Sequence, residues 1–88
     1  MNINFWIGRR VLLTGHTGFK GGWLAIWLSR LGAHVTGLSL PPSFPSFYDA
    51  ADISKCAKEY FFDIRDAQAV SKIVTLVQPE IVFHLAAQ

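Results

Sequence analysis

The stretch VLLTGHTGFKGGWL, residues 11–24, decides the fold. Its first three residues are all apolar, which is typical of a short strand buried at the centre of a parallel sheet. A glycine-rich turn follows the strand. From residue 19 to about residue 31, apolar residues recur at helical spacing, so we predict a helix that ends before Gly32.

Three glycines at intervals of three, Gly15, Gly18 and Gly21, carry the functional signal of this turn. The first permits a tight turn, the second lets the backbone approach a pyrophosphate, and the third lets the helix pack closely on the sheet. The N–H groups and dipole at the helix N-terminus favour the same anion. The spacing is neither GxGxxG nor that of a P-loop. We predict dinucleotide binding, and turn glycines with a purely structural role are the alternative.

Two polar residues of the turn are candidate ligands of the dinucleotide. Lys20 lies in the first helical turn, where repulsion by the positive end of the helix dipole should destabilise a cation by about 0.3–1 kcal/mol. A bound phosphate would make the position favourable for a cation instead. A solvated surface lysine is the alternative. His16 can touch phosphate or ribose, or it can be an ordinary loop residue, and the sequence favours neither.

Three further strands are expected, at residues 34–40, 59–63 and 81–85. The last two flank a second helix, which Asp66 is suited to cap at its N-terminus and which Pro79 ends. Strands that alternate with helices predict a parallel sheet with right-handed crossovers. The fold class is therefore α/β, the N-terminal half of a Rossmann-type doubly wound parallel sheet.

The predicted sheet is incomplete. A parallel sheet needs helices on both faces, and the strand at residues 81–85 would be a bare edge. We therefore expect residues 1–88 to be a partial Rossmann domain, an N-terminal fragment whose remaining sheet and substrate domain lie outside this chain. Residues 41–58 are irregular and aromatic, and we expect them to pack on another part of the protein, with one helical turn near residues 48–53.

The ends of the later strands hold further candidates. A dinucleotide fold usually places an acid after the second strand for the ribose hydroxyls, but Ser39 stands nearest that position, so NAD and NADP both remain open. Asp63 can accept a hydrogen bond from an adenine amino group while Ile64 packs on the ring. A capping role for Asp63 at the strand end is the alternative.

Other conspicuous residues are expected to be structural. Trp23 and Trp27 lie on the apolar face of the first helix, so we expect them in the core. His84, on an apolar strand, is expected to be a hydrogen-bonded core histidine rather than a base. Cys56 has no histidine near it in sequence and is expected to be structural.

Composition excludes several classes of protein. The 88 residues are 51% hydrophobic with a net charge of +2, which argues against disorder. Residues 1–48 hold four bases and no acid, a balance that suits an anion site, but the scattered bases form no stripe for nucleic acid. No apolar run is long enough to cross a membrane. A single cysteine excludes an internal disulfide, and we expect a cytoplasmic protein.

Residues 5–24, 63–66 (DIRD) and 78–88 (QPEIVFHLAAQ) together resemble the extended short-chain dehydrogenase/reductase family of nucleotide-sugar enzymes. Within it they are most similar to the CDP-glucose 4,6-dehydratases. The resemblance covers nearly the whole chain and is loose only over residues 41–60. It implies NAD as cofactor. The implied site residues are Gly15, Thr17, Gly18, Phe19 and Lys20 at the pyrophosphate, Asp63 and Ile64 near adenine, and Leu85, Ala86 and Ala87 along the ribose and phosphate path.

The resemblance also implies a reaction. Such enzymes oxidise C4 of CDP-glucose, lose water across C5–C6 and return the hydride to C6, a lyase reaction used in polysaccharide biosynthesis. Their catalytic Tyr-x-x-x-Lys lies downstream, and Tyr60 does not match it because Ile64 takes the lysine position. We therefore expect no catalytic residue in this chain, an inactive fragment, and a homo-oligomer at full length. Another epimerase or dehydratase of the superfamily, or a non-catalytic dinucleotide sensor, is the alternative.

Overall fold

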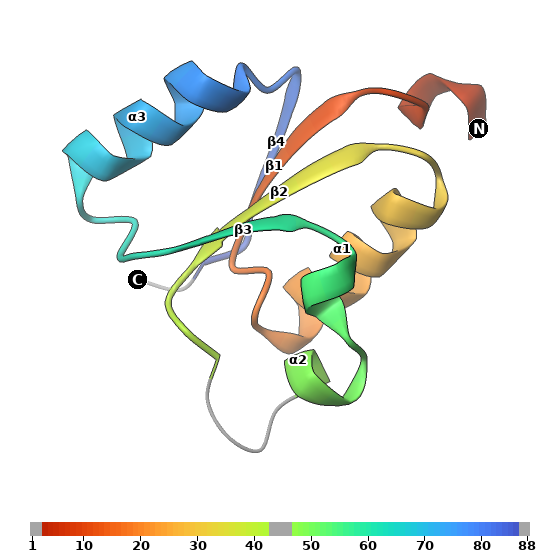
Figure 1. Ribbon diagram of the computed structural model, residues 1–88, viewed down its shortest axis with the longest axis horizontal. Coiled ribbons are helices and arrows are strands. Elements are labelled where there is room, and N and C mark those ends of the chain that lie inside the picture. The colour runs from red at the N-terminus through yellow and green to blue at the C-terminus, as the bar shows by residue number, and fades with distance from the viewer. Residues whose placement is uncertain (1–2, 43–46, 87–88) are drawn as a thin grey trace.

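Four parallel strands form the predicted sheet, in the order β3-β2-β1-β4 (Figure 1). The computed structural model describes residues 3–42 and 47–86. Its strands are β1 (Arg10–Thr14), β2 (His34–Ser39), β3 (Lys58–Phe61) and β4 (Ile81–His84). In the register of the sheet, Leu12 of β1 pairs with Thr36 of β2 and with Val82 of β4. Because all pairings are parallel, the strands end at one edge, which we call the carboxyl edge.

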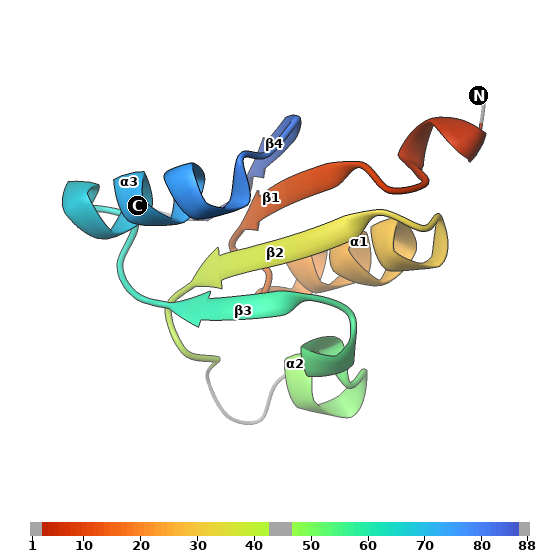
Figure 2. The ribbon, with the colours of Figure 1, turned by 45° about the horizontal axis from the view of Figure 1, so that its top comes forward.

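Helices cover both faces of the sheet, as the doubly wound prediction requires (Figure 2). The helical elements are η1 (Ile3–Trp6), α1 (Phe19–Arg30), α2 (Phe47–Ala50), η2 (Ile53–Lys55) and α3 (Ala67–Val77). The α1 and α2 helices lie on one face, and α3 lies on the other. The strand order reverses between β1 and β4, which is the switch point where open α/β sheets bind ligands. The predicted fold class is confirmed.

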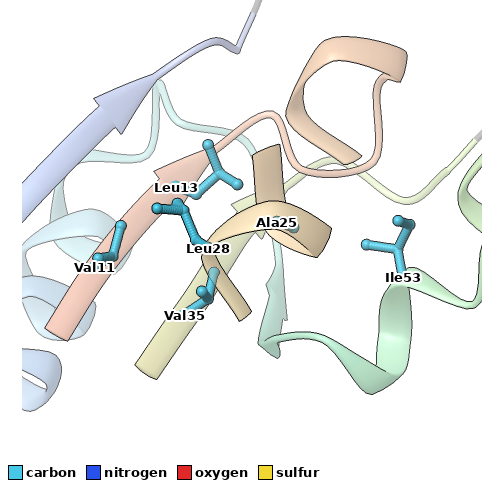
Figure 3. Close-up of a cluster of buried hydrophobic side chains, with 6 residues drawn as sticks. All are labelled: Val11, Leu13, Ala25, Leu28, Val35 and Ile53. Carbon is cyan, nitrogen blue, oxygen red and sulfur yellow. The ribbon is translucent and has the colours of Figure 1, made fainter. Parts of the chain in front are cut away.

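The central strand β1 is buried on both faces because successive side chains of a strand point to opposite sides. Val11 and Leu13 join the cluster under α1, which Figure 3 shows. Leu12 points the other way and packs with Leu38 of β2 and Ile73 of α3. The cluster drawn in Figure 3 contains Val11, Leu13, Ala25, Leu28, Val35 and Ile53.

The expectation that Trp23 and Trp27 belong to the core is wrong. Their side chains are 54% and 63% exposed. The side of α1 that contacts the sheet carries smaller residues, among them Ala25 and Leu28, because close packing leaves no space there for an indole. Trp23 instead stacks on Phe47 of α2, with ring centroids 5.5 Å apart.

Two local predictions about the second half of the sheet differ in outcome. Asp66 does cap α3, since its carboxylate accepts a hydrogen bond from the Ala69 N–H at 3.1 Å. The third strand ends at Phe61, two residues earlier than predicted. Beyond it, the Asp63 carboxylate accepts from the Arg65 N–H at 2.8 Å, a local turn that bends the chain away from the sheet.

The stretch after β2 packs on the rest of the protein, as expected, through residues 47–57; residues 43–46 lie outside the described residues. The α2 and η2 elements lie under α1, and Ile53 is fully buried in the cluster of Figure 3. Within residues 3–42 and 47–86, no helix is long and apolar enough to cross a membrane. The same residues contain no group of three or more side chains suited to hold a metal ion.

Candidate functional site

A cleft of about 420 Å³ lies at the carboxyl edge of the sheet. Segments that follow all four strands contribute to it, so residues far apart in sequence meet there. Its lining consists of Gly15, Thr17, Gly18, Ser39, Leu40, Asp63, Ile64, Arg65, Leu85 and Ala86. The position agrees with the general rule that ligands of open parallel sheets bind at the switch point.

The glycine-rich loop, residues 15–18, forms the floor of the cleft in a conformation that requires glycine. Gly15 has a φ of +84°, and a Cβ there would lie 2.8 Å from the backbone nitrogen of Ala86. At Gly21 a Cβ would overlap the carbonyl oxygen of Gly15, so the predicted close packing of helix on loop is present. Gly18 is different, because its nearest neighbour would be 3.5 Å away.

The N-terminus of α1 points its first-turn N–H groups toward the loop. The N-cap residue is Gly18, which has no side chain and so makes no capping hydrogen bond. The first turn of the helix contains no acidic residue. The first N–H groups of any helix lack intrahelical acceptors, so an anion can satisfy them. This arrangement suits a pyrophosphate beside Gly18.

Phe19 and Lys20, which the sequence assigned to the pyrophosphate, do not line the cleft with their side chains. They border a second hollow, the outer hollow, which is lined mainly by side chains of α1. Its other lining residues are Trp23, Leu24, Ile26, Trp27, Arg30 and Leu85. Phe19 and Lys20 can therefore contribute to an anion site through their backbone N–H groups.

The end of β2 holds a hydroxyl pair where many dinucleotide folds have an acid. The Oγ atoms of Ser39 and Thr17 are 2.7 Å apart, and Thr17 donates to the Leu40 carbonyl at 3.2 Å. Either hydroxyl can donate in the bond between Thr17 and Ser39. Ser39 is nearly buried, at 7% exposure, so its hydroxyl is held in place at the wall of the cleft.

Asp63 and Arg65 form a second polar wall. The Arg65 Nε lies 3.0 Å from each Asp63 carboxylate oxygen, and its Nη2 lies 2.6 Å from Oδ2. These hydrogen bonds and that from the Arg65 N–H lower the pKa of Asp63 to about 2. The carboxylate is therefore charged at neutral pH and still an acceptor. Sequence reasoning missed Arg65 and Leu40, although the two-residue spacing of Asp63 and Arg65 is that of a local side-chain turn.

Thr14 shapes the fourth side of the cleft. Its Oγ1 accepts hydrogen bonds from the N–H groups of Leu85 at 3.1 Å and Ala86 at 3.3 Å, and lies 2.7 Å from His84 Nδ1. The Leu85 N–H also donates to the Thr14 carbonyl oxygen at 3.0 Å, and the His84 tautomer decides which group donates between Thr14 and His84. These bonds draw the segment after β4 over Gly15. His84 is hydrogen-bonded as predicted, but it is exposed rather than in the core.

The structure thus brings most of the sequence-predicted site together. Seven of the ten residues line one cleft: Gly15, Thr17, Gly18, Asp63, Ile64, Leu85 and Ala86. Phe19 and Lys20 lie on the outer hollow, and Ala87 lies outside the described residues. His16 points away from the cleft, and its buried ring lies 2.9 Å from Glu59, so the loop-residue interpretation fits it.

Known proteins resemble this chain in sequence and structure. The family described as "NAD dependent epimerase/dehydratase family" matches residues 11–88. A CDP-glucose 4,6-dehydratase of Salmonella typhimurium is 45% identical over 86 residues, which are 97% of this chain and 24% of that protein. UDP-glucuronate 4-epimerase 1 of Arabidopsis thaliana is 35% identical over 89 residues, 92% of this chain and 20% of that protein.

A solved structure of an epimerase is also similar to this chain. The UDP-glucose 4-epimerase of Thermotoga maritima, determined with UDP-glucose, superposes with a TM-score of 0.71 at 31% identity. The match covers 89% of this chain and 24% of that one. The chain therefore spans a quarter or less of the length of these relatives.

Proposed function

Because this chain belongs to the NAD-dependent epimerase/dehydratase family, we propose that it is the cofactor-binding part of a CDP-glucose 4,6-dehydratase. The observation that carries the proposal is the 45% identity to such an enzyme over 97% of the chain. The cleft supports it, since seven of the ten residues that the family resemblance assigns to the cofactor converge there from three separate segments.

The residues of the cleft fit NAD. The open position at Gly18 and the uncapped N-terminus of α1 would hold the pyrophosphate. Asp63 would accept from the adenine amino group, and Ile64 would pack on the ring. Leu85 and Ala86 would lie along the ribose and phosphate path. When bound, NAD supplies the acceptor, and later the donor, of a hydride.

In the proposed reaction, C4 of CDP-glucose is oxidised, water leaves across C5–C6, and hydride returns to C6 to give CDP-4-keto-6-deoxyglucose. The role of this chain is to bind and orient. The described residues include no Tyr-x-x-x-Lys pair, and we propose that the acid–base groups belong to the remainder of a longer protein. Residues 1–88 alone are accordingly expected to convert no CDP-glucose. We also propose a cytoplasmic, homo-oligomeric enzyme that serves polysaccharide biosynthesis.

A second candidate function is nucleotide-sugar 4-epimerisation, which the likeness to plant and bacterial epimerases favours. Both reactions begin with oxidation at C4. They differ afterwards, because an epimerase returns the hydride to C4 and eliminates no water from the sugar. A sensor that binds the dinucleotide without catalysis is a third candidate.

The deciding experiment incubates the intact protein that carries this sequence with NAD and, separately, with CDP-, UDP-, dTDP- and GDP-glucose. Mass spectrometry of the products detects the loss of water, and ¹H NMR distinguishes a C4 epimer from unreacted substrate of the same mass. A CDP-sugar lighter by one water supports the proposal. An isomer of unchanged mass supports an epimerase, and saturable NAD binding without conversion of any sugar supports the sensor.

A further inference from the structure

We propose that Glu59 and Tyr48 are positioning residues for the dinucleotide site, acting through His16 on the glycine-rich loop. The inference rests on the proposed NAD site, but neither Glu59 nor Tyr48 lines the cleft. They lie on β3 and α2, and form with the buried His16 a partly buried polar cluster that we call the brace.

The His16 ring is seated in space that a glycine leaves free. The ring is 0% exposed, and a Cβ on Gly37 of β2 would come within 2.5 Å of its Cγ and Nδ1 atoms. The ring of Phe61 lies 5.8 Å from it, between centroids, on the neighbouring strand. His16 is therefore wedged between the loop and the sheet and cannot reorient without moving one of them.

The hydrogen bonding indicates which nitrogen of the His16 ring carries the proton. Its Nε2 lies 2.9 Å from Glu59 Oε2, whereas its Nδ1 is buried and has no hydrogen-bond partner among the described residues. A neutral imidazole has one N–H, and a carboxylate can only accept. The proton therefore belongs on Nε2, where it meets an acceptor, and the Nδ1 lone pair faces the interior.

Tyr48 holds the other side of the carboxylate. Its hydroxyl lies 2.8 Å from Glu59 Oε1 and 2.6 Å from Oε2. Burial, together with the neighbouring carboxylate, raises the pKa of Tyr48 to about 12, so the hydroxyl keeps its proton and stays a donor. Glu59 thus accepts from two donors that come from different segments, and its own position on β3 is fixed by pairing with β2.

The brace acts on the cleft because His16 lies between two residues that line it. Gly15 precedes it and donates its N–H to the Leu38 carbonyl at 2.9 Å. Thr17 follows it and is hydrogen-bonded to Ser39. A ring locked beneath the loop fixes the backbone of both neighbours, and a preformed loop avoids the ordering cost of binding.

The test compares four variants of the intact protein: Glu59→Ala, Glu59→Gln, Tyr48→Phe and Glu80→Ala. Glu80→Ala is the matched control. It also removes an acid that joins two segments, since Glu80 pairs with Arg9 at 2.8 Å, but it does so at the opposite edge of the sheet. The measurements are the dissociation constant of NAD by calorimetry and the midpoint of urea unfolding.

Glu59→Ala leaves the His16 N–H without an acceptor and should weaken NAD binding about tenfold or more. Glu59→Gln keeps a carbonyl acceptor for that N–H and should stay within about threefold of wild type, a rescue that marks hydrogen bonding as the cause. Tyr48→Phe should fall between these two. Glu80→Ala should lower the unfolding midpoint and leave NAD binding unchanged.

A folded Glu59→Ala protein that binds NAD as wild type does would overturn the inference. So would an equal loss of affinity in Glu80→Ala at equal loss of stability. If Glu59→Ala does not fold, the ¹⁵N spectrum of His16 in the wild type decides: the account requires an unprotonated Nδ1 and a protonated Nε2, and the reverse contradicts it. A wild-type protein that binds no NAD would instead refute the proposed function.

Discussion

The carbonyl oxygen of Gly15 occupies the space where a Cβ of residue 21 would be. The loop that follows β1 and the first turn of α1 are therefore in contact backbone to backbone. Gly18, between them, meets nothing closer than 3.5 Å. The three glycines of the turn consequently have different roles: Gly15 and Gly21 allow the loop to form, and Gly18 keeps open the space in which a pyrophosphate would lie.

Gly18→Ala and Gly21→Ala should separate folding from binding. The Gly18 backbone, with φ −80° and ψ 170°, suits alanine, so this variant should unfold as wild type does but bind NAD at least about tenfold more weakly, because the added methyl meets the pyrophosphate. Gly21→Ala overpacks the loop and should lose about 1–3 kcal/mol of stability or more. Urea unfolding and NAD calorimetry measure the two effects. Similar profiles for both variants would contradict the division of roles.

Thr14→Val should destabilise the protein by about 1–3 kcal/mol, because the nearly buried Thr14 hydroxyl, which accepts a hydrogen bond from the N–H of Ala86, is lost. Thr14→Ser keeps the hydroxyl and is the matched control. Chemical denaturation of the two variants gives the comparison. Equal stability of Thr14→Val and wild type would show that water replaces the hydroxyl at no cost.

Arg65→Met should raise the pKa of Asp63 from about 2 toward 3.8, its ordinary value. A carboxyl group with a lowered pKa stabilises the folded state at pH values above its ordinary pKa, and that contribution is lost as the pH falls toward 2. The variant keeps the backbone N–H of residue 65 and should therefore lose most, but not all, of the dependence of stability on pH in this window. A ¹³C NMR titration of the Asp63 carboxyl group checks the shift directly. An unchanged midpoint would mean that Arg65 does not pair with Asp63 in solution.

Lys20→Ala should weaken NAD binding by less than about threefold, because Lys20 borders the outer hollow rather than the cleft, and the substitution keeps its backbone N–H. Calorimetry measures the dissociation constant of NAD for Lys20→Ala and for Gly18→Ala, and the two values are compared. A loss of NAD affinity of tenfold or more would show that the Lys20 ammonium group contacts the phosphate, as the sequence alone suggested.

The sequence was sufficient for the fold class and for most of the cleft. The apolar run before Gly15 and the spacing of the glycines are local patterns, and the alternation of strands with helices then determines a parallel sheet whose ends meet. Asp63, Ile64, Leu85 and Ala86 could be assigned to the same edge for that reason.

Side-chain direction was not predictable in the same way. Helical spacing places Trp23 and Trp27 on a broad apolar face, but the part of that face that meets the sheet depends on how closely α1 approaches, and the small residues decide this. The inward turn of His16 depends on the absence of a side chain at Gly37, which is distant in sequence. No local sequence pattern predicts that His16 packs against Gly37.

The most direct test of the account is an NMR titration of the intact protein with NAD, followed through assigned backbone amides. We predict that the signals of Gly15, Thr17, Gly18 and Ile64 shift together and saturate with one dissociation constant, because all four line the cleft. Saturable binding that leaves these signals in place, and shifts those of Trp23 and Trp27 at the outer hollow instead, would contradict the assignment of the cofactor to the cleft.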